Sequence, residues 1–472
     1  MKKHYETHVE DTDKLISVAG PVLDYKSWYE QYRKLMEEQA QRKYGLYTPT
    51  SEGDDDDFPS IPGITARYSA SGLTNEQMAE NPVWVDKTGN GHDLQLKNFA
   101  WKEGSGISDI YPGALVFDGV DDWAGCDNLP LLPKEKGYSI IALRNWITRY
   151  DATQYKRPLI SNLDTNDEGA FLIEYRKDEN VNDVTGSYNS FTDVYIDDNN
   201  PITWQTSSSY NGQIIKKGTS KSTNKLCICK TYFGQLSNYA NAAIWEIVIL
   251  DHDATEEELT KIKDYFVKTY PWLFPDQAWT VTGKTNEDKD RATIANITGN
   301  GNNLVLSNFG FAEGSGYNEE GEYAGYLVTD GVDDMIGSSI FEIGKDFTII
   351  GEWKFMDNII ANAGISKALS LFVYNTNNGL RIFINNTTRG PVLNTKTLKA
   401  ICSDGRVYSD DWSEMIVNEE QPITSSKSSL LIGINGNNFA KIALKNLAIY
   451  NQILSKDDCI KAYNYLQTLK AK

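Results

Sequence analysis

Hydrophobic and polar residues alternate along this chain over short stretches, which is typical of half-buried strands. The alternation is clear in Leu94-Gln95-Leu96, from Thr348 to Glu352 and from Trp245 to Leu250. Between such stretches lie turn-forming sequences such as Thr-Gly-Asn-Gly, Asp-Gly and Asn-Gly. This pattern predicts an all-β fold in which many short antiparallel strands stack as β-sandwiches.

The pattern occurs twice. The sequence TGNGHDLQLKNFAWKEGSG at Thr88–Gly106 returns as TGNGNNLVLSNFGFAEGSG at Thr298–Gly316, and LVFDGVDDWAG at Leu115–Gly125 returns as LVTDGVDDMIG at Leu327–Gly337. The two copies are about 200 residues long, whereas the units of solenoid repeats are roughly 20 to 50 residues. The sequence therefore predicts two tandem sandwich domains, 63–272 and 273–472, after an N-terminal region, 1–62.

Each copy is expected to close with one helix. Thr255 with Glu258, and Ser455 with Asp458, have the spacing of a capping box, although Asp is the weaker partner. In the first copy an apolar stripe predicts a helix that packs on the sandwich, formed by Leu259, Ile262 and Phe266.

The N-terminal region differs from the repeats. Residues 24–44 carry a capping box, Ser27 to Glu30, and one apolar helical row: Trp28, Tyr32, Leu35 and Met36. The polar, acidic tract 48–57 after this helix is typical of a flexible linker. Two interpretations remain: the helix packs on its own repeat domain, or it is an arm that anchors the chain to a larger assembly or to copies of itself.

The composition and net charge of the chain limit the classes of molecule that it is expected to bind. Of 472 residues 40% are hydrophobic and 11% aromatic, too many for a disordered chain. The 46 Lys and Arg residues against 65 Asp and Glu residues give a net charge of −19. Nucleic acids and anionic membranes are therefore not expected partners, whereas uncharged glycans and cations are compatible with this surface.

Neither a signal peptide nor a membrane span is expected. The two lysines after Met1 are not followed by an apolar segment, and no stretch approaches the roughly 18 apolar residues of a membrane helix. The five cysteines form no CxxC motif and are expected to be buried hydrophobic residues. If the run LCIC is a strand, Cys227 and Cys229 share one face.

At Ile64–Leu96 and Leu115–Asp122 the chain resembles the concanavalin A-like lectin/glucanase superfamily, in particular the laminin-G-like jelly rolls of bacterial and phage proteins. The resemblance rests on a W-x-D-x-(S/T)-G-N-G-x-D motif at Trp84–Asp93 and an F-D-G-x-x-D motif at Phe117–Asp122. It implies a sandwich of two curved sheets that recognises glycans or proteins, sometimes with calcium.

The second copy departs from this motif. It has Ile294 and Asn296 in place of Trp84 and Asp86. If Trp84 and Asp86 carry function, the second copy has lost it.

Enzymes of the glucanase branch carry an E-x-D-x-(x)-E strand, which supplies the paired carboxylates of a retaining glycosidase. This chain has no such strand, and the nearest acidic strand offers only Glu246 in its interior. No G-x-S-x-G motif is present either. The prediction is a protein that is not an enzyme; the alternative is a glycan depolymerase whose carboxylates come from different strands.

An acidic cluster recurs in both copies, as Asp118, Asp121 and Asp122 and as Asp330, Asp333 and Asp334. Carboxylates clustered on a loop suit a hard cation such as calcium. The alternative is turn chemistry, in which Asp side chains accept hydrogen bonds from backbone amides.

Glycan binding needs exposed aromatic rings beside polar groups. The candidates are Trp123, next to the acidic loop, and Trp204, in the polar stretch 199–209, together with Trp84 and Asp86 of the motif.

An arm, an acidic linker and two sandwiches of this type fit a bacteriophage structural protein, a head or tail fibre or decoration component located in the virion. The repeat pair resembles modules of phages that infect gut Bacteroidota. The expected partners are other virion proteins at the arm, host-surface glycans at the sandwiches, and further copies of the chain. An alternative is a purely architectural virion protein without a ligand.

Overall fold

The computed structural model describes most of the chain from Asp57 onward. The described residues are 57–132, 137–148, 156–164, 172–176, 184–186, 202–206, 223–234, 238–356, 364–367, 371–376, 379–384, 387–393, 397–416, 426–435 and 438–471. The chain divides into two compact units, Met1–Phe58 and Pro59–Lys472, and both repeats belong to the second unit. The predicted helix over 24–44, with Trp28, Tyr32, Leu35 and Met36, lies outside the described residues.

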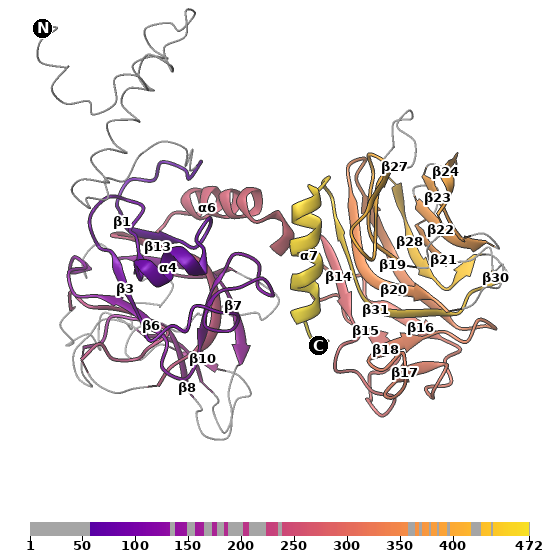
Figure 1. Ribbon diagram of the computed structural model, residues 1–472, viewed down its shortest axis with the longest axis horizontal. Coiled ribbons are helices and arrows are strands. Elements are labelled where there is room, and N and C mark those ends of the chain that lie inside the picture. The colour runs from indigo at the N-terminus through magenta and orange to yellow at the C-terminus, as the bar shows by residue number, and fades with distance from the viewer. Residues whose placement is uncertain are drawn as a thin grey trace, which may run out of the picture. The chain divides into compact units, whose positions relative to one another are not determined.

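The first repeat consists of two antiparallel sheets (Figure 1). One sheet is six-stranded, in the order β11 (Ile202–Thr206), β7 (Ser139–Thr148), β13 (Asn241–Leu250), β5 (Leu115–Asp118) and β4 (Gly106–Ile107), with β1 (Ile64–Ser69) also paired to β13. The other is seven-stranded, in the order β10 (Val184–Gly186), β9 (Leu172–Arg176), β8 (Lys156–Ser161), β12 (Leu226–Ile228), β6 (Trp123–Cys126), β3 (Leu94–Lys97) and β2 (Val83–Trp84).

These two sheets enclose one hydrophobic core. Phe117 and Ile247 reach it from the six-stranded sheet, and Leu96 and Ile160 reach it from the seven-stranded sheet. The alternation in the sequence explains this packing, because successive side chains of a strand point to opposite faces. On β3, for example, the two leucines are buried, whereas Gln95 and Lys97 are exposed.

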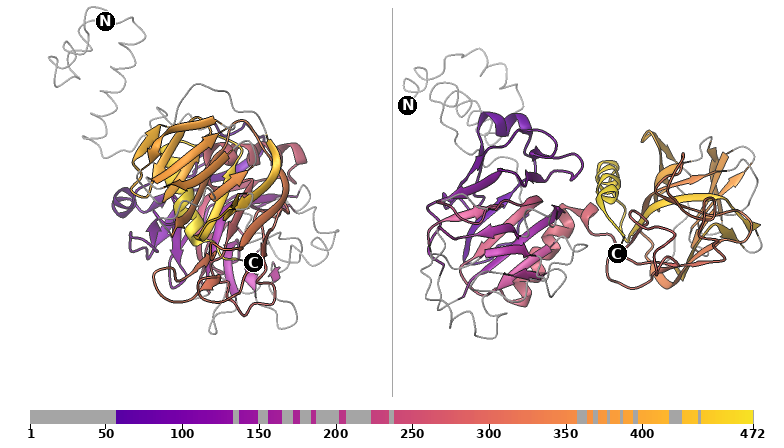
Figure 2. Two further views of the ribbon diagram at one scale, coloured as in Figure 1. Left: turned by 90° about the vertical axis from the view of Figure 1, so that its right-hand side faces the viewer. Right: turned by 90° about the horizontal axis from the view of Figure 1, so that it is seen from below.

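The second repeat has the same organisation (Figure 2). One eight-stranded sheet contains β17 (Gly316–Asn318), β18 (Tyr326–Val328), β31 (Ile442–Tyr450), β20 (Thr348–Phe355), β25 (Leu398–Cys402), β26 (Arg406–Ser409) and β27 (Glu414–Ile416), with β14 (Gln277–Thr280) paired to β31. The other contains β15 (Thr293–Ile294), β16 (Leu304–Ser307), β19 (Met335–Ile343), β28 (Ser426–Ile432), β21 (Gly364–Lys367), β22 (Leu371–Thr376), β23 (Gly379–Ile384) and β24 (Thr387–Leu393). A two-stranded ribbon is formed by β29 (Ile434–Asn435) and β30 (Asn438–Phe439).

Strand pairing repeats along with the sequence. The pairs β1–β13, β5–β13 and β6–β12 of the first repeat correspond to β14–β31, β18–β31 and β19–β28 of the second. The prediction of an all-β fold is confirmed, since the described chain is mostly strands in antiparallel sheets with few helices.

Each repeat closes with a helix, as predicted. Helix α6 (Glu256–Thr269) begins with a complete capping box between Thr255 and Glu258. Helix α7 (Lys456–Thr468) begins at Ser455, whose hydroxyl accepts the N–H of Asp458. A short helix that the sequence pattern did not predict, α4 (Asn75–Glu80), is capped by Thr74, and a 3-10 turn, η2 (Pro271–Leu273), comes after α6.

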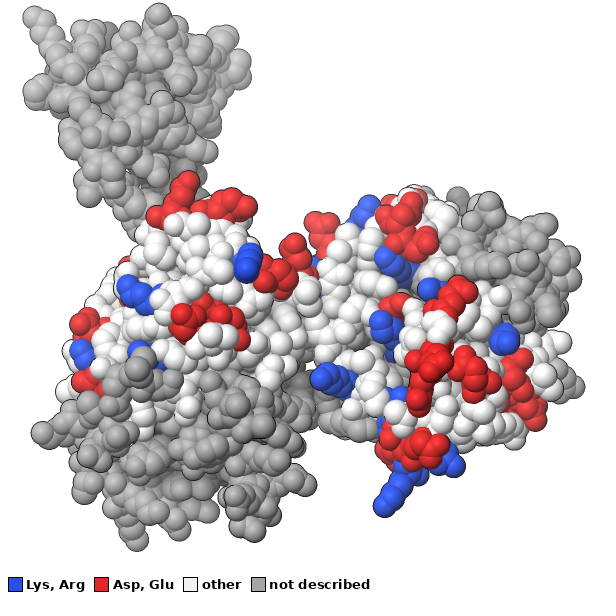
Figure 3. All heavy atoms as spheres, turned by 60° about the horizontal axis from the view of Figure 1, so that its bottom comes forward, with Lys and Arg blue, Asp and Glu red and all other residues white. Residues whose placement is uncertain are grey.

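On the face shown in Figure 3, acidic side chains of the described residues are widespread, with basic side chains between them, in keeping with the net charge of −19 of the whole chain. Among the described residues, no helix has the length and apolar character needed to cross a bilayer.

Candidate functional site

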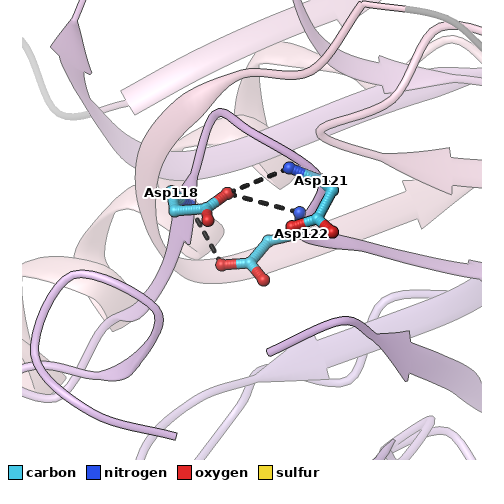
Figure 4. Close-up of side chains that lie close together, drawn as sticks. All are labelled: Asp118, Asp121 and Asp122. Carbon is cyan, nitrogen blue, oxygen red and sulfur yellow. Dashed lines mark hydrogen bonds between the residues drawn. The ribbon is translucent and has the colours of Figure 1, made fainter. Parts of the chain in front are cut away.

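The acidic loop of the first repeat joins β5 to β6 and is closed by its own carboxylates (Figure 4). Oδ1 of Asp118 accepts the N–H groups of Val120 at 2.7 Å, Asp121 at 3.2 Å and Asp122 at 3.3 Å. In return, Oδ2 of Asp122 accepts the N–H of Asp118 at 3.0 Å. These bonds satisfy backbone donors that a tight turn leaves without partners.

The same loop concentrates negative charge. One carboxylate oxygen from each of Asp118, Asp121 and Asp122 lies within 4.8 Å of the others. Burial raises the pKa of Asp122 to about 6; the Ser105 hydroxyl and the Asp118 amide oppose the rise, and the neighbouring carboxylates add to it. A hard cation would be attracted here, but calcium takes six to eight oxygen ligands and would compete with bonds that hold the turn. The carboxylates therefore fit turn chemistry better than a calcium site.

The second repeat reproduces the loop bond for bond. Oδ1 of Asp330 accepts the N–H groups of Val332, Asp333 and Asp334 at 2.7, 3.3 and 3.4 Å, and Oδ2 of Asp334 accepts the N–H of Asp330 at 2.7 Å. The two repeats differ at many other positions, so this shared network indicates a requirement of the fold.

Trp84 and Asp86, which were expected to contact glycans, are both buried in the first repeat. Trp84 is only 1% exposed and donates its indole N–H to the Ser69 carbonyl at 2.8 Å. Asp86 is 3% exposed, and its Oδ1 accepts the amide N–H groups of Arg67 and Thr88. Neither side chain presents a surface to a sugar, and this expectation is corrected.

The difference between Asp86 and Asn296 does not mark a lost site either. Oδ1 of Asn296 accepts the N–H groups of Ala278 and Thr298 at 3.1 and 3.2 Å, as Asp86 does with Arg67 and Thr88. Both residues organise the same turn, because an amide oxygen serves this purpose as well as a carboxylate.

Trp123, by contrast, lies on the outer face of the seven-stranded sheet. Its neighbour Ala124 points into the core, so the indole points away from it and is partly exposed. The Trp123 and Phe233 rings form a T-shaped pair at a centroid distance of 5.6 Å, and the Lys230 ammonium lies over the Trp123 ring at 4.0 Å. Trp204 lies on β11 in the other sheet, so the two tryptophans do not form one row.

Three residues of this outer cluster, Phe233, Lys225 and Lys230, were not predicted from the sequence. The two lysines flank the run LCIC, in which the sequence pattern indicated a role only for the cysteines. Cys227 points to the outer face, whereas Cys229, with a left-handed φ of 58°, turns into the core. The expectation that both share one face is corrected, because the strand ends at Ile228. Both cysteines are buried, as predicted.

Glu246, the nearest acidic strand residue to a glycosidase carboxylate, is buried and fully engaged. It is 0% exposed and accepts hydrogen bonds from Arg67, Tyr265 and Tyr270. A substrate at the surface has no access to it.

Comparisons with known proteins give distant likenesses among solved structures. No family profile matches the chain, and no curated protein matches it. Among solved structures, Trypanosoma rangeli sialidase in complex with sialic acid is 12% identical, covers 47% of this chain and 40% of its own, and has a TM-score of 0.28. A tryptophan-to-alanine mutant of HCR/D is 9% identical, covers 81% of this chain and 97% of its own, and has a TM-score of 0.31. At this distance the likenesses identify neither a family nor an activity.

Proposed function

We propose that this chain is a structural protein of a bacteriophage virion that binds glycans through its first repeat. In this proposal each repeat is a jelly-roll sandwich of the concanavalin A-like lectin/glucanase superfamily, and the N-terminal arm attaches the chain to other virion proteins or to copies of itself. The paired antiparallel sheets of each repeat and the acidic linker ahead of them support it.

The observation that carries the glycan-binding part is the divergence of the two repeats on one outer sheet face. The turns and the core are retained in both. At Trp123, however, the second repeat has Met335, which also comes after the acidic loop and begins the corresponding strand. An aromatic ring kept partly exposed beside polar groups is the arrangement that sugar recognition requires.

A glycan array with the full-length protein tests this function. The wild-type chain is expected to bind a subset of glycans, and Trp123→Ala is expected to abolish that binding. Met335→Ala is the matched control in the second repeat and is expected to bind as the wild type does. Absence of binding to every glycan would leave an architectural virion protein, and equal binding by Trp123→Ala would move the site elsewhere.

The enzyme alternative is separated by a second assay on the same material. A depolymerase releases reducing ends from a bound polysaccharide, whereas a binding protein releases none. Incubation of bound glycan with the full-length chain is expected to leave its length unchanged.

The virion location is tested independently of glycan binding. Antibodies against the chain are expected to label purified particles, and a chain that lacks residues 1–62 is expected to be absent from them. Labelling of host cells but not of particles would refute the virion assignment.

A further inference from the structure

The outer face of strands β6 and β12 combines two aromatic rings with two lysines. The Lys230 ammonium lies 4.0 Å from the centre of the Trp123 ring, and the Lys225 ammonium lies 5.0 Å from the centre of the Phe233 ring. Both distances are within the range of cation–π attraction. We call these four residues the lysine–aromatic cluster.

The charge of Lys230 is only partly compensated. Lys230 is 7% exposed, and its Nζ donates one hydrogen bond, to the Phe233 carbonyl at 3.3 Å. Within the described part of the chain it makes no salt bridge with a carboxylate. Burial lowers the pKa of this ammonium, which shows the cost of keeping a cation there.

The acidic groups around the cluster leave this charge available. Lys225 pairs with Asp127 at 3.8 Å, but that carboxylate is 69% exposed, and surface pairs of this kind are weak. Asp164 lies beside Gly234, with its Oδ1 2.9 Å from the position of an added Cβ, and it forms no salt bridge with Lys230 among the described residues. A chain with a net charge of −19 thus keeps two cations together on one sheet face.

The second repeat shows that the fold does not need this cluster. Strand pairing places Gly337 opposite Leu431, just as it places Gly125 opposite Cys227 in the first repeat. Counted along the chain from these paired residues, Met335, Ser429 and Ile434 correspond in sequence to Trp123, Lys225 and Lys230. All charges are gone there, although both strands and the core beneath them remain.

We infer that the lysine–aromatic cluster binds the acidic group of a charged sugar. In this arrangement Lys230 and Lys225 contact the anion, and the edges of the Trp123 and Phe233 side chains contact the sugar ring. This inference rests on the proposed glycan binding and specifies its ligand class. Because the ammonium of Lys230 occupies a face of the indole, a neutral sugar cannot stack on that face. An anionic substituent, in contrast, gains a charge-assisted contact there.

Calorimetric titration of the full-length protein tests the inference with four probes: sialyllactose, a glucuronate oligosaccharide, a sulfated galactose oligosaccharide and neutral lactose. At least one acidic probe is expected to bind about tenfold or more tightly than lactose, as one charge-assisted hydrogen bond predicts. The identity of the acidic probe that binds shows whether the anion comes from a sialic acid, a uronic acid or a sulfate group. Added salt is expected to weaken this binding.

Charge-removing variants locate the site. Lys230→Gln and Lys225→Gln are each expected to weaken binding of the acidic probe by about tenfold. Lys263→Gln, which removes an exposed lysine of α6, is the matched control and is expected to bind normally. Lys225 is partly exposed, so its variant keeps the test valid if the Lys230 variant is poorly folded.

The outcomes separate this inference from the proposed function. Equal binding of lactose and the acidic probes, unaffected by both lysine variants, would overturn the inference and leave glycan binding intact. No binding to any sugar, on the array or in solution, would overturn both.

Discussion

Arg67 and Glu246 form a buried two-pronged ion pair between β1 and β13. Nε of Arg67 donates to Oε2 of Glu246 at 3.1 Å, and its Nη2 donates to Oε1 at 3.2 Å. Tyr265 of α6 and Tyr270 just after it donate to the same carboxylate at 3.0 and 2.9 Å. The Glu246 carboxylate therefore links the closing helix of the first repeat to its six-stranded sheet through hydrogen bonds.

Removal of one residue of the Arg67–Glu246 ion pair is expected to destabilise the first repeat strongly. Arg67→Ala leaves a buried carboxylate without its cation and should lower the free energy of unfolding by about 3 to 5 kcal/mol. The second repeat has Ala278 and Asn446 at the corresponding positions of its β14–β31 pair. The double variant Arg67→Ala/Glu246→Asn, which copies this pair, should therefore be more stable than Arg67→Ala alone. Denaturant unfolding measures both, and a double variant less stable than the single would contradict the prediction.

His252 gives the first repeat a pH-dependent contact. Its Nδ1 lies 3.1 Å from Oδ1 of Asp251, and its Nε2 lies 3.2 Å from Oε1 of Glu258. A neutral imidazole has only one N–H, so two carboxylate partners favour the doubly protonated ring. Burial opposes the charge, but the hydrogen bonds to Asp251 and Glu258 outweigh it and raise the pKa of His252.

The sign of the effect follows from this raised pKa. The stabilisation is complete below the unfolded-state pKa of about 6.5 and is lost as the pH rises through the folded-state value. The side chain is 28% exposed, so we expect an effect of at most about 1 kcal/mol. His252→Gln, which copies Gln452 of the second repeat, should lower the melting temperature at acidic pH and leave it unchanged above pH ~8. An equal loss at both pH values would show that the ring acts by packing alone.

The acidic loop is expected to respond to substitution according to its hydrogen bonds. Asp118→Ala removes the acceptor of three backbone N–H groups and should cost about 1 to 3 kcal/mol. Asp121→Ala removes an exposed carboxylate of the same cluster and should change stability by less than about 0.5 kcal/mol. Thermal unfolding of the two variants measures the difference. If Asp121→Ala proved the more damaging, the carboxylates would have a role beyond the turn.

Calcium is expected to leave the stability of the full-length chain unchanged. A cation bound at a hundred times its dissociation constant would add about 2.7 kcal/mol and raise the melting temperature measurably. One carboxylate oxygen of Asp118 and one of Asp122 are already bound to backbone amides, so we expect no rise at millimolar calcium. A rise that Asp121→Asn abolishes would restore the calcium interpretation.

The sequence predicted those features that depend on local pattern. Strand alternation, the duplication and the caps at Thr255 and Ser455 are each set by residues close together in the chain, and all are present. The roles of Trp84 and Asp86 were predicted wrongly because a motif states which residues are present and not which face they occupy. Lys230 was missed because its contact with Trp123 joins residues more than a hundred positions apart.

Gly125 offers a direct test of the geometry beneath the lysine–aromatic cluster. An added Cβ there would lie 2.7 Å from Cζ3 of Trp123 and 2.7 Å from the Leu226 carbonyl oxygen, distances that real Cβ atoms do not tolerate. Gly125→Ala should therefore displace the indole, cost about 1 to 3 kcal/mol and remove glycan binding as Trp123→Ala does.

Gly337 is the matched position in the second repeat, where an added Cβ meets only Cδ2 of Leu431 at 3.4 Å. Gly337→Ala should be nearly neutral in both stability and binding, because ordinary van der Waals contact replaces open space. Fluorescence of the partly exposed Trp123, thermal unfolding and the glycan array measure the three effects of each variant. If Gly125→Ala kept the indole environment and the binding of the wild type, the ring would not depend on this glycine, and the arrangement assigned to the cluster would be wrong.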